Sequence, residues 1–346
     1  MLRVLVAEDS ATARALLVSI FSRDPELEVI GEAHDGEQAV AMCKALRPDV
    51  VSMDIQMPNL DGIEATRQIM IECTTPIVIV SSLDAADIRR SMHALNAGAL
   101  AVLAKPNGPG SPRFERDSID LVATIKAMAQ VKMVRRWPPG LPYQQVAAPS
   151  TEPSHLTTVI GIAASTGGPN ALRKLLSDLP ATFDTPILIV QHIASGFAEG
   201  FAVWLGEAAG RPVGLATNGA PLERGHCYVA PDDRHIGLGP DGRLSLSAAA
   251  PIEGFRPAGN HLFASLARTA GRHAVGVILT GMGSDGVTGS KEIKAAGGLV
   301  IAQDEATCDV FGMPGAAIHA GVVREGTPID KIAARLVQIV SVSRPA

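Results

Sequence analysis

Short apolar runs alternate with amphipathic patterns through the first part of the chain. The apolar runs are "RVLVAE", "LEVIGEA", "DVVSMDI", "PIVIVSS" and "ALAVLAK", and each is rich in Val, Ile, Leu or Ala. In the segment after each run, apolar residues recur at the spacing of one helix face. Strands that alternate with helices predict a parallel sheet covered by helices on both faces. We therefore expect residues 1–133 to form a doubly wound α/β domain with a parallel sheet.

A second alternating region begins at about residue 156. The stretch before it, "RRWPPGLPYQQVAAPSTEPSH", holds five prolines and has no helix or strand period, so residues 134–155 are predicted to be a linker. The later strand candidates are "TTVIGIAAS", "PILIVQH", "RPVGLAT", "HCYVAP", "HAVGVILTG" and "GLVIAQD". A hairpin is expected in "RHIGLGPDGRLSLSA", with its turn at Asp-Gly. Residues 156–346 are thus predicted to form a second, Rossmann-like α/β domain with a doubly wound parallel sheet.

Composition narrows the classes of partner. The net charge of −5 disfavours nucleic acid or an anionic membrane as the main partner. No apolar stretch approaches the roughly 20 residues of a membrane span, and "MLRVLVAEDS" lacks the apolar region of a signal peptide. The four cysteines are scattered without the spacing of zinc ligands. A cytoplasmic protein with no nucleic-acid partner and no membrane insertion is expected.

Polar residues lie at the predicted strand ends of the first domain. Glu8 and Asp9 end the first strand, Asp54 the third, Ser81 the fourth and Lys105 the fifth. The carboxyl ends of parallel strands share one edge, where ligands bind. Clustered carboxylates suit Mg²⁺, and Asp54 could attack a phosphoryl group whose oxygens Lys105 and Ser81 would contact. The alternative is that these acidic residues only form caps and turns.

In the second domain, "GIAASTGGPN" predicts a strand that turns into a helix, with Ser165 in the turn. Such a turn either cradles a phosphate or presents a nucleophile. The lysine of a phosphate-binding loop is missing, because Pro169 and Asn170 follow the second glycine. His192 at the end of "PILIVQH" and Asp285 in "TGMGSDG" lie at the same predicted edge. They could serve as a base and its orienting acid.

Other assignments remain open on the residues alone. Ser165 could be a helix N-cap, and His192 could be an ordinary buried polar group. The competing bases are His226 and His235, and the competing acids are Asp232, Asp233 and Asp304.

The first domain resembles the receiver domain of bacterial response regulators. "AEDS", "SMDIQMPNLDG", "IVSS" and "LAKP" match the pattern of that family in order and spacing. The resemblance implies a flavodoxin-like fold. It also implies that Asp54 is the phospho-acceptor and that Glu8 and Asp9 form the acid pair of the Mg²⁺ site. It makes Ser81 the switch hydroxyl and Lys105 the partner of the phosphate.

The second domain resembles the catalytic domain of chemotaxis protein-glutamate methylesterases, the CheB family. The matching runs are "IGIAASTGGP", "IVQHI", "GHCYVAPDDRH", "AVGVILTGMGSDG" and "IAQDEATCDVFGMPGAAI". The resemblance implies a catalytic triad of Ser165, His192 and Asp285, with Thr166 and Met282 as substrate or oxyanion contacts. The sequence departs from the family at two places. Residues 193–195 are Ile-Ala-Ser instead of Met-Pro-Pro, and Asn260 stands at an acidic position.

Together these resemblances predict a phosphorylation-activated serine esterase. It would hydrolyse glutamate methyl esters on methyl-accepting chemotaxis receptors, release methanol, and deamidate receptor glutamines. A chemotaxis histidine kinase of the CheA type would be the phosphodonor. Mg²⁺ would serve receiver phosphorylation only, and ester hydrolysis would need no cofactor. The alternative is a non-catalytic response regulator whose output domain binds a protein partner.

Overall fold

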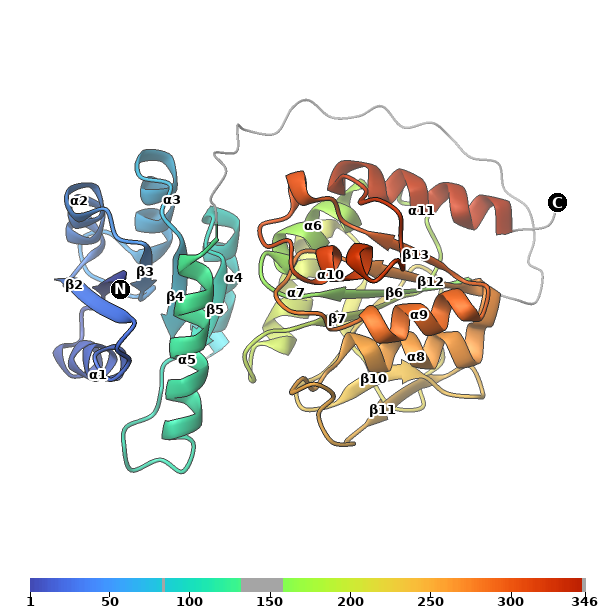
Figure 1. The fold of residues 1–346 in the computed structure, drawn as a ribbon, viewed down its shortest axis with the longest axis horizontal. Helices are drawn as coiled ribbons and strands as arrows, with labels where there is room; N and C mark the ends of the chain where they lie inside the picture. Colours follow the sequence, from blue (N-terminus) through green and yellow to red (C-terminus); the bar gives the residue numbers. More distant parts are fainter. Residues whose placement is uncertain (83–84, 132–157, 344–346) are drawn as a thin grey trace. The chain divides into compact units, whose positions relative to one another are not determined.

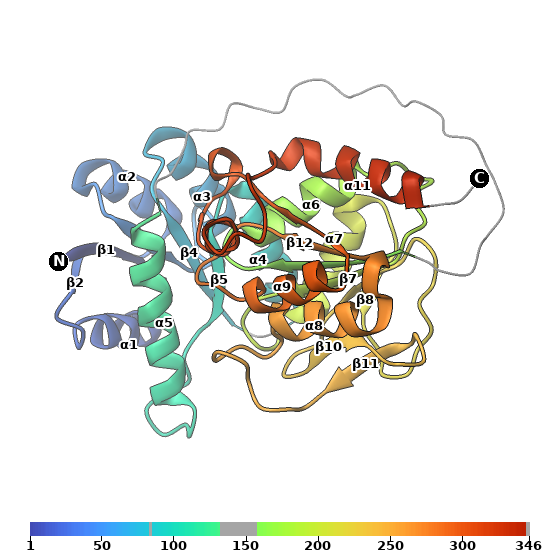
Figure 2. The same ribbon diagram turned by 45° about the vertical axis from the view of Figure 1, so that its right-hand side comes forward.

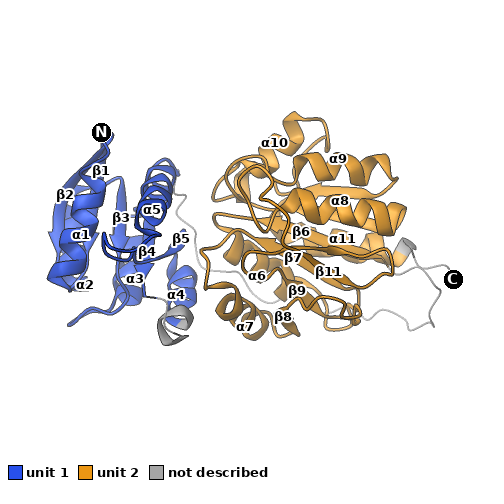
Figure 3. Cartoon of the chain, turned by 90° about the horizontal axis from the view of Figure 1, so that it is seen from below, with its two compact units in different colours: residues 1–137 blue, residues 138–346 orange. Residues whose placement is uncertain are grey.

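The computed structural model describes residues 1–82, 85–131 and 158–343. The chain divides into two compact units, residues 1–137 and 138–346 (Figure 3). The predicted linker at 134–155 lies outside the described residues. Within the described ranges, no helix is long and apolar enough to cross a membrane.

The first unit is a parallel five-stranded sheet between two helix layers, as the alternating pattern predicted. Its strand order is β2-β1-β3-β4-β5, the flavodoxin-like order. Helices α1 and α5 cover one face, and α2, α3 and α4 cover the other (Figures 1 and 2). The strands are β1 (Leu2–Ala7), β2 (Leu27–Ala33), β3 (Val50–Met53), β4 (Ile77–Ser81) and β5 (Ala101–Ala104). The helices are α1 (Ala11–Phe21), α2 (Gly36–Leu46), α3 (Gly62–Glu72), α4 (Ala85–Ala97) and α5 (Phe114–Ala129).

The register of this sheet sets which residues meet at its carboxyl edge. Ala7 at the end of β1 pairs with Met53 at the end of β3, and Ser81 at the end of β4 pairs with Ala104 in β5. Because paired strands end together, the residues that follow them enter one shared edge.

The second unit holds a parallel six-stranded sheet of order β13-β12-β6-β7-β9-β8. Its strands are β6 (Val159–Ala164), β7 (Ile187–Gln191), β8 (Val213–Leu215), β9 (Cys227–Val229), β12 (Ala274–Ile278) and β13 (Leu299–Ala302). The predicted hairpin forms a separate antiparallel pair, β10 (His235–Leu238) and β11 (Leu244–Ser247). The doubly wound parallel sheet expected here is confirmed.

Two helix layers enclose this sheet (Figures 1 and 2). One layer contains α6 (Gly168–Asp178), α7 (Ala198–Ala209) and α11 (Ile329–Ser343), and the other contains α8 (Gly259–Ala270) and α9 (Val287–Ala295). Shorter helices are α10 (Met313–His319), η1 (Gly271–His273) and η2 (Glu305–Thr307). Because α6 leaves β6 toward one face and α9 leaves β12 toward the other, the adjacent strands β6 and β12 flank a topological switch point. Ligands bind at such points in doubly wound sheets.

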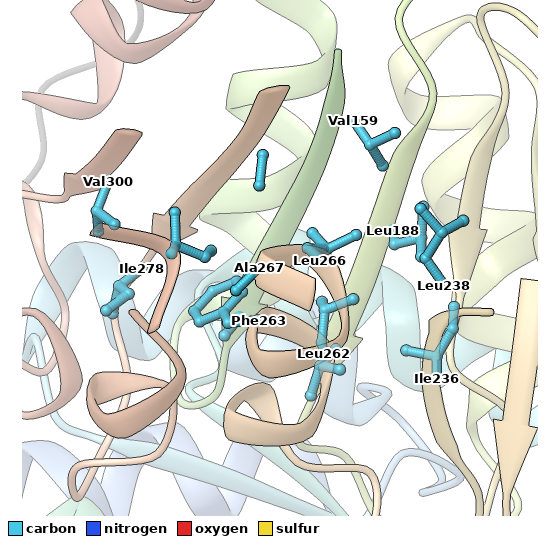
Figure 4. Packing of buried hydrophobic residues seen from close by; sticks show 14 of the residues in the cluster. Val159, Leu188, Ile236, Leu238, Leu262, Phe263, Leu266, Ala267, Ile278 and Val300 are labelled. Carbon is cyan, nitrogen blue, oxygen red and sulfur yellow. The ribbon is translucent and has the colours of Figure 1, made fainter. Parts of the chain in front are cut away.

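Helix α8 packs tightly against the sheet beneath this edge (Figure 4). Leu262, Phe263 and Leu266 form its apolar stripe and are fully buried. A Cβ at Gly161 in β6 would lie 2.7 Å from Leu266 Cδ1 and 3.2 Å from the Phe263 ring. The absence of a side chain at Gly161 thus lets α8 lie close to β6.

Candidate functional site

Ser165 directly follows β6 in a hydrogen-bonded loop. Its N–H donates to the carbonyl of Thr280 (3.0 Å), and its carbonyl accepts from the Gly168 N–H (2.8 Å) and from Gln191 Nε2 (2.8 Å). The N-cap of α6 is Gly167, with φ 74° and no side-chain capping bond. The alternative that Ser165 is the N-cap of this helix is therefore wrong.

The loop after β12 lies against Ser165. A Cβ at Gly281 would lie 2.6 Å from Ser165 Cβ, so the two backbones approach as closely as glycine allows. Met282, the next residue, is 43% exposed, and Thr166 is half-buried. Among the described residues, neither the Thr166 nor the Met282 backbone N–H donates a hydrogen bond. These two N–H groups belong to the residues that follow Ser165 and Gly281 in the two adjoining loops.

His192, directly after β7, is paired with Asp285. Its Nε2 lies 2.9 Å from Asp285 Oδ2, and the carboxylate is fully buried. The carboxylate also accepts from the N–H groups of Gly259 (2.5 Å) and Asn260 (2.9 Å), at the start of α8. An anion is stabilised there by unpaired N–H groups and the helix dipole. Burial alone would raise the pKa of Asp285, but the hydrogen bond and charge of His192 and the two N–H donors outweigh it and lower that pKa.

This pairing sets the tautomer of the imidazole. Because the Asp285 carboxylate only accepts hydrogen bonds, Nε2 carries the proton and the lone pair is on Nδ1. Nδ1 of His192 is buried and has no hydrogen-bond partner among the described residues. Ala164 and Gln191 pair at the ends of β6 and β7, so Ser165 and His192 leave neighbouring strands at the same edge. No hydrogen bond joins Ser165 Oγ to the ring in the described structure, and in substrate-free enzymes such bonds are often long.

Gln191 joins the serine loop to the histidine. Gln191 is only 4% exposed. Its Nε2 donates to the backbone carbonyls of Ser165 and His192, at 2.8 Å each. It therefore fixes the spacing between the two backbones. Gln191 is not among the residues predicted from the sequence, although a polar residue at the end of the apolar run "ILIVQ" was a signal.

The competing residues are engaged elsewhere. His235 contacts the Ala250 carbonyl, His226 lies by Glu223, Asp232 accepts from Gly196, Asp233 pairs with Arg256, and Asp304 caps η2. The structure thus brings His192, rather than either rival histidine, to Asp285.

The first unit gathers an acidic cluster at its carboxyl edge. Oxygen atoms of Glu8, Asp9 and Asp54 lie within 4.8 Å of one another. Lys105 Nζ is 2.9 Å from Glu8 Oε2 and 3.0 Å from Asp54 Oδ2. Glu8 and Asp54 are almost fully buried, whereas Asp9 is exposed. The predicted phosphorylation residues therefore come together although they are distant in sequence.

The electrostatics of this cluster favour a bound dication. Burial raises the pKa of Glu8, as does the charge of Asp54, and Lys105 only partly offsets both. Burial likewise raises the pKa of Asp54. Three carboxylates with one ammonium leave two negative charges among oxygen ligands, which fits Mg²⁺ in charge and donor type.

Two further features suit phosphoryl transfer at this edge. Ser81 Oγ is buried with no hydrogen-bond partner among the described residues, so it can donate to an incoming oxygen. A cavity of about 550 Å³ lies beside the cluster, and its lining includes Asp9, Ile55 and Met57.

A close backbone contact also constrains the position of Asp54. A Cβ at Gly62 would lie 1.9 Å from the Asp54 carbonyl oxygen, so this position requires glycine. Gly62 is not among the residues predicted from the sequence, where only its place after Asp61 in "NLDG" marks a turn.

Comparison with known proteins agrees with this division of the chain. The CheB methylesterase family model matches residues 160–336, and the response regulator receiver domain model matches residues 4–111. A relative from Myxococcus xanthus, named protein-glutamate methylesterase/protein-glutamine glutaminase 4, is 54% identical over 97% of this chain and 96% of its own length. A relative from Anaeromyxobacter dehalogenans, named protein-glutamate methylesterase/protein-glutamine glutaminase 3, is 53% identical over 97% of this chain and 98% of its own length.

A solved structure shares the fold of the second unit. The crystal structure of the Thermotoga maritima CheB methylesterase catalytic domain is 36% identical, with a TM-score of 0.51 over 53% of this chain and 98% of that one. The relatives match both units in one polypeptide, so the likeness is not confined to the widespread receiver domain. The chain belongs to the CheB methylesterase family, with a response regulator receiver domain preceding the methylesterase domain.

Proposed function

We propose that the protein is a phosphorylation-activated protein-glutamate methylesterase and protein-glutamine glutaminase in which Ser165 is the nucleophile. One observation carries the assignment. His192, beside the Ser165 loop, is held by the buried Asp285, and its Nδ1 has no hydrogen-bond partner among the residues that the structure describes. The names of the relatives supply the substrate class, a glutamate methyl ester or a glutamine amide in a protein.

Acylation follows from this geometry. Ser165 Oγ attacks the ester carbonyl carbon while its proton passes to His192 Nδ1, and Asp285 stabilises the imidazolium. The new O–C bond converts the carbonyl oxygen to an oxyanion, toward which the Thr166 and Met282 N–H groups would donate. The tetrahedral intermediate then collapses. The C–O bond to the methoxy group breaks, His192 returns the proton, and methanol leaves.

Deacylation repeats these roles with water. His192 takes a proton from water, the resulting hydroxide attacks the acyl carbon, and the bond to Ser165 Oγ breaks as the serine regains its proton. The products are a glutamate side chain and the free enzyme. With a glutamine substrate the leaving group is ammonia, and the later step is the same.

The receiver unit would control this activity through Asp54. Its carboxylate oxygen attacks a phosphoryl group and forms an acyl phosphate, while Lys105 and Ser81 contact the phosphoryl oxygens. Glu8, Asp9 and Asp54 would hold Mg²⁺, which when bound neutralises charge on those oxygens. In this proposal Mg²⁺ serves only phosphorylation, and ester hydrolysis needs no cofactor.

The partners follow from the family and from both reactions. A receiver domain takes its phosphoryl group from a histidine kinase, here of the CheA type, and the esterase would act on methyl-accepting chemotaxis receptors. Both partners would meet the protein in the cytoplasm. Receiver and esterase families in one chain support this pairing.

Methanol release from methylated receptor membranes tests the proposal. The whole chain should release methanol, more rapidly with a small phosphodonor and Mg²⁺. Ser165→Ala should reduce release to background, and Asp54→Asn should abolish only the response to phosphodonor. If the wild-type chain releases no methanol under any condition, the alternative of a non-catalytic, protein-binding output domain is favoured instead.

A further inference from the structure

The imidazole of His192 is covered by an aromatic ring that neither the triad nor the sequence motifs include. Phe255, in the segment between β11 and α8, stacks on His192 with ring centroids 4.1 Å apart and planes 3° from parallel. The His192 side chain is only 11% exposed. One face of the base is therefore closed by Phe255, while its edge at Nε2 is held by Asp285.

The backbone around Phe255 forms a tight turn that presents this ring. Ile252 and Phe255 exchange N–H···O bonds of 3.0 and 2.9 Å, and the two residues between them have positive φ, 51° at Glu253 and 88° at Gly254. This is the pattern of a type I′ hairpin turn, which holds its flanking residues in a defined register. Arg256 anchors the segment by donating to two backbone carbonyls of the same stretch, at 3.1 and 3.3 Å.

We infer that Phe255 is a positioning residue for the general base. The ring restricts rotation of the imidazole away from the position in which Asp285 holds it, and it covers one face of the base against water. Its π face also attracts the positive charge that His192 acquires as it takes the proton. Because this attraction grows as the proton passes from Ser165 to His192, the contact acts on kcat more than on KM. This inference rests on the proposed esterase chemistry.

A serine-directed fluorophosphonate probe tests this role without receptor. Ser165 Oγ forms a bond to phosphorus, fluoride leaves, and the serine proton passes to His192, so the labelling rate reports activation of the nucleophile. In the whole chain, Phe255→Leu should label about three- to tenfold more slowly, and Phe255→Tyr, which keeps the ring, should label within about twofold of wild type. Methanol release should show the same loss in kcat with KM nearly unchanged.

A pair of glycine variants makes the test independent of the ring itself. Gly254→Ala strains the turn beneath Phe255, and Gly242→Ala imposes the same kind of strain in the β10–β11 turn, where φ is 75°. Neither added methyl meets an atom of the described residues within 4 Å, so these substitutions perturb the backbone conformation rather than the packing. Gly254→Ala should slow labelling and Gly242→Ala should not.

Three results would overturn the inference. The first is a labelling rate of Phe255→Leu equal to that of wild type. The second is an effect of Phe255→Leu on the KM of methanol release with kcat unchanged. The third is equal slowing of labelling by the two glycine variants. Failure of the proposed function is distinguishable, because a chain that labels at Ser165 but releases no methanol lacks the substrate activity while the effect of Phe255 remains measurable.

Discussion

Replacing Asp285 by asparagine tests the arrangement that holds the base. In the native protein the carboxylate accepts three hydrogen bonds, from His192 Nε2 and from the Gly259 and Asn260 N–H groups. An asparagine side chain of nearly the same shape has one oxygen and one NH₂ group. At least one of the three donors must then face another donor.

The expected loss of activity is large. If NH₂ faces the ring, His192 must accept at Nε2, which places the proton on Nδ1 and removes the lone pair needed to activate Ser165. The same substitution in a Ser-His-Asp protease lowers kcat by about 10⁴-fold, and we expect roughly 10³–10⁴-fold here. Losing one charge-assisted hydrogen bond inside the protein should also cost about 1.5–3 kcal/mol of stability.

Methanol release and thermal melting together separate these two effects. Activity is measured well below the Tm of Asp285→Asn, so that an unfolded fraction cannot account for the loss. Asp304→Asn is a matched control, because its carboxylate also accepts from a backbone N–H, at the start of η2, and it was a competing acid in the sequence. It should keep near wild-type activity. Wild-type turnover by Asp285→Asn, or a large loss in Asp304→Asn, would refute the reasoning.

The same carboxylate predicts a pH dependence of stability. The pKa of Asp285 is lowered from the ordinary value of 3.8, so the ionised form favours the folded state. Its contribution to the free energy of unfolding is fully present above about pH 4 and is lost as pH falls through the lower native pKa. The difference in stability between wild type and Asp285→Asn should therefore narrow below about pH 4.

Two further predictions concern other titratable groups. Asp9→Asn should weaken Mg²⁺ binding and slow phosphorylation of Asp54 by acetyl phosphate, because it removes a carboxylate from the cluster. Phosphorylation is measured as the increase in intact mass. An unchanged Mg²⁺ requirement would contradict the assigned site. Burial lowers the pKa of His261 to about 4, helped by the nearby charges of His235 and Arg268. Between about pH 6.5 and pH 4 the unfolded chain protonates His261 while the folded protein keeps it neutral, so the free energy of unfolding falls as the pH falls. His261→Phe should therefore flatten the dependence of Tm on pH between these values. An unaltered slope would disprove this.

The alternation of apolar runs and amphipathic segments was sufficient to predict both sheets. Parallel strands buried on both faces need continuous apolar runs, and the helices between them need one apolar stripe, so both patterns are local. The same logic placed the polar residues at strand ends. Glu8, Asp54, Ser165 and His192 each follow an apolar run directly, and their arrival at a carboxyl edge needed only the parallel topology.

Local patterns did not decide which of these side chains interact. His192 and Asp285 are 93 residues apart in the sequence. The two N–H donors to Asp285 at the start of α8, Gly259 and Asn260, precede it by 26 and 25 residues. These contacts depend on the strand order and on how closely α8 packs against β6 at Gly161.

The sequence by itself determined two parallel α/β domains, their carboxyl edges and a short set of candidate residues, because hydrophobic periodicity and strand direction follow from nearest neighbours along the chain. Only the tertiary structure decided the rest. It brought His192, and neither of the other two candidate histidines, to Asp285, left Nδ1 without a hydrogen-bond partner among the described residues, and placed Phe255 over the ring. The physical reason is that a hydrogen bond or ring contact forms only over a few ångströms. Packing of the whole domain determines which segments, distant in sequence, come that close.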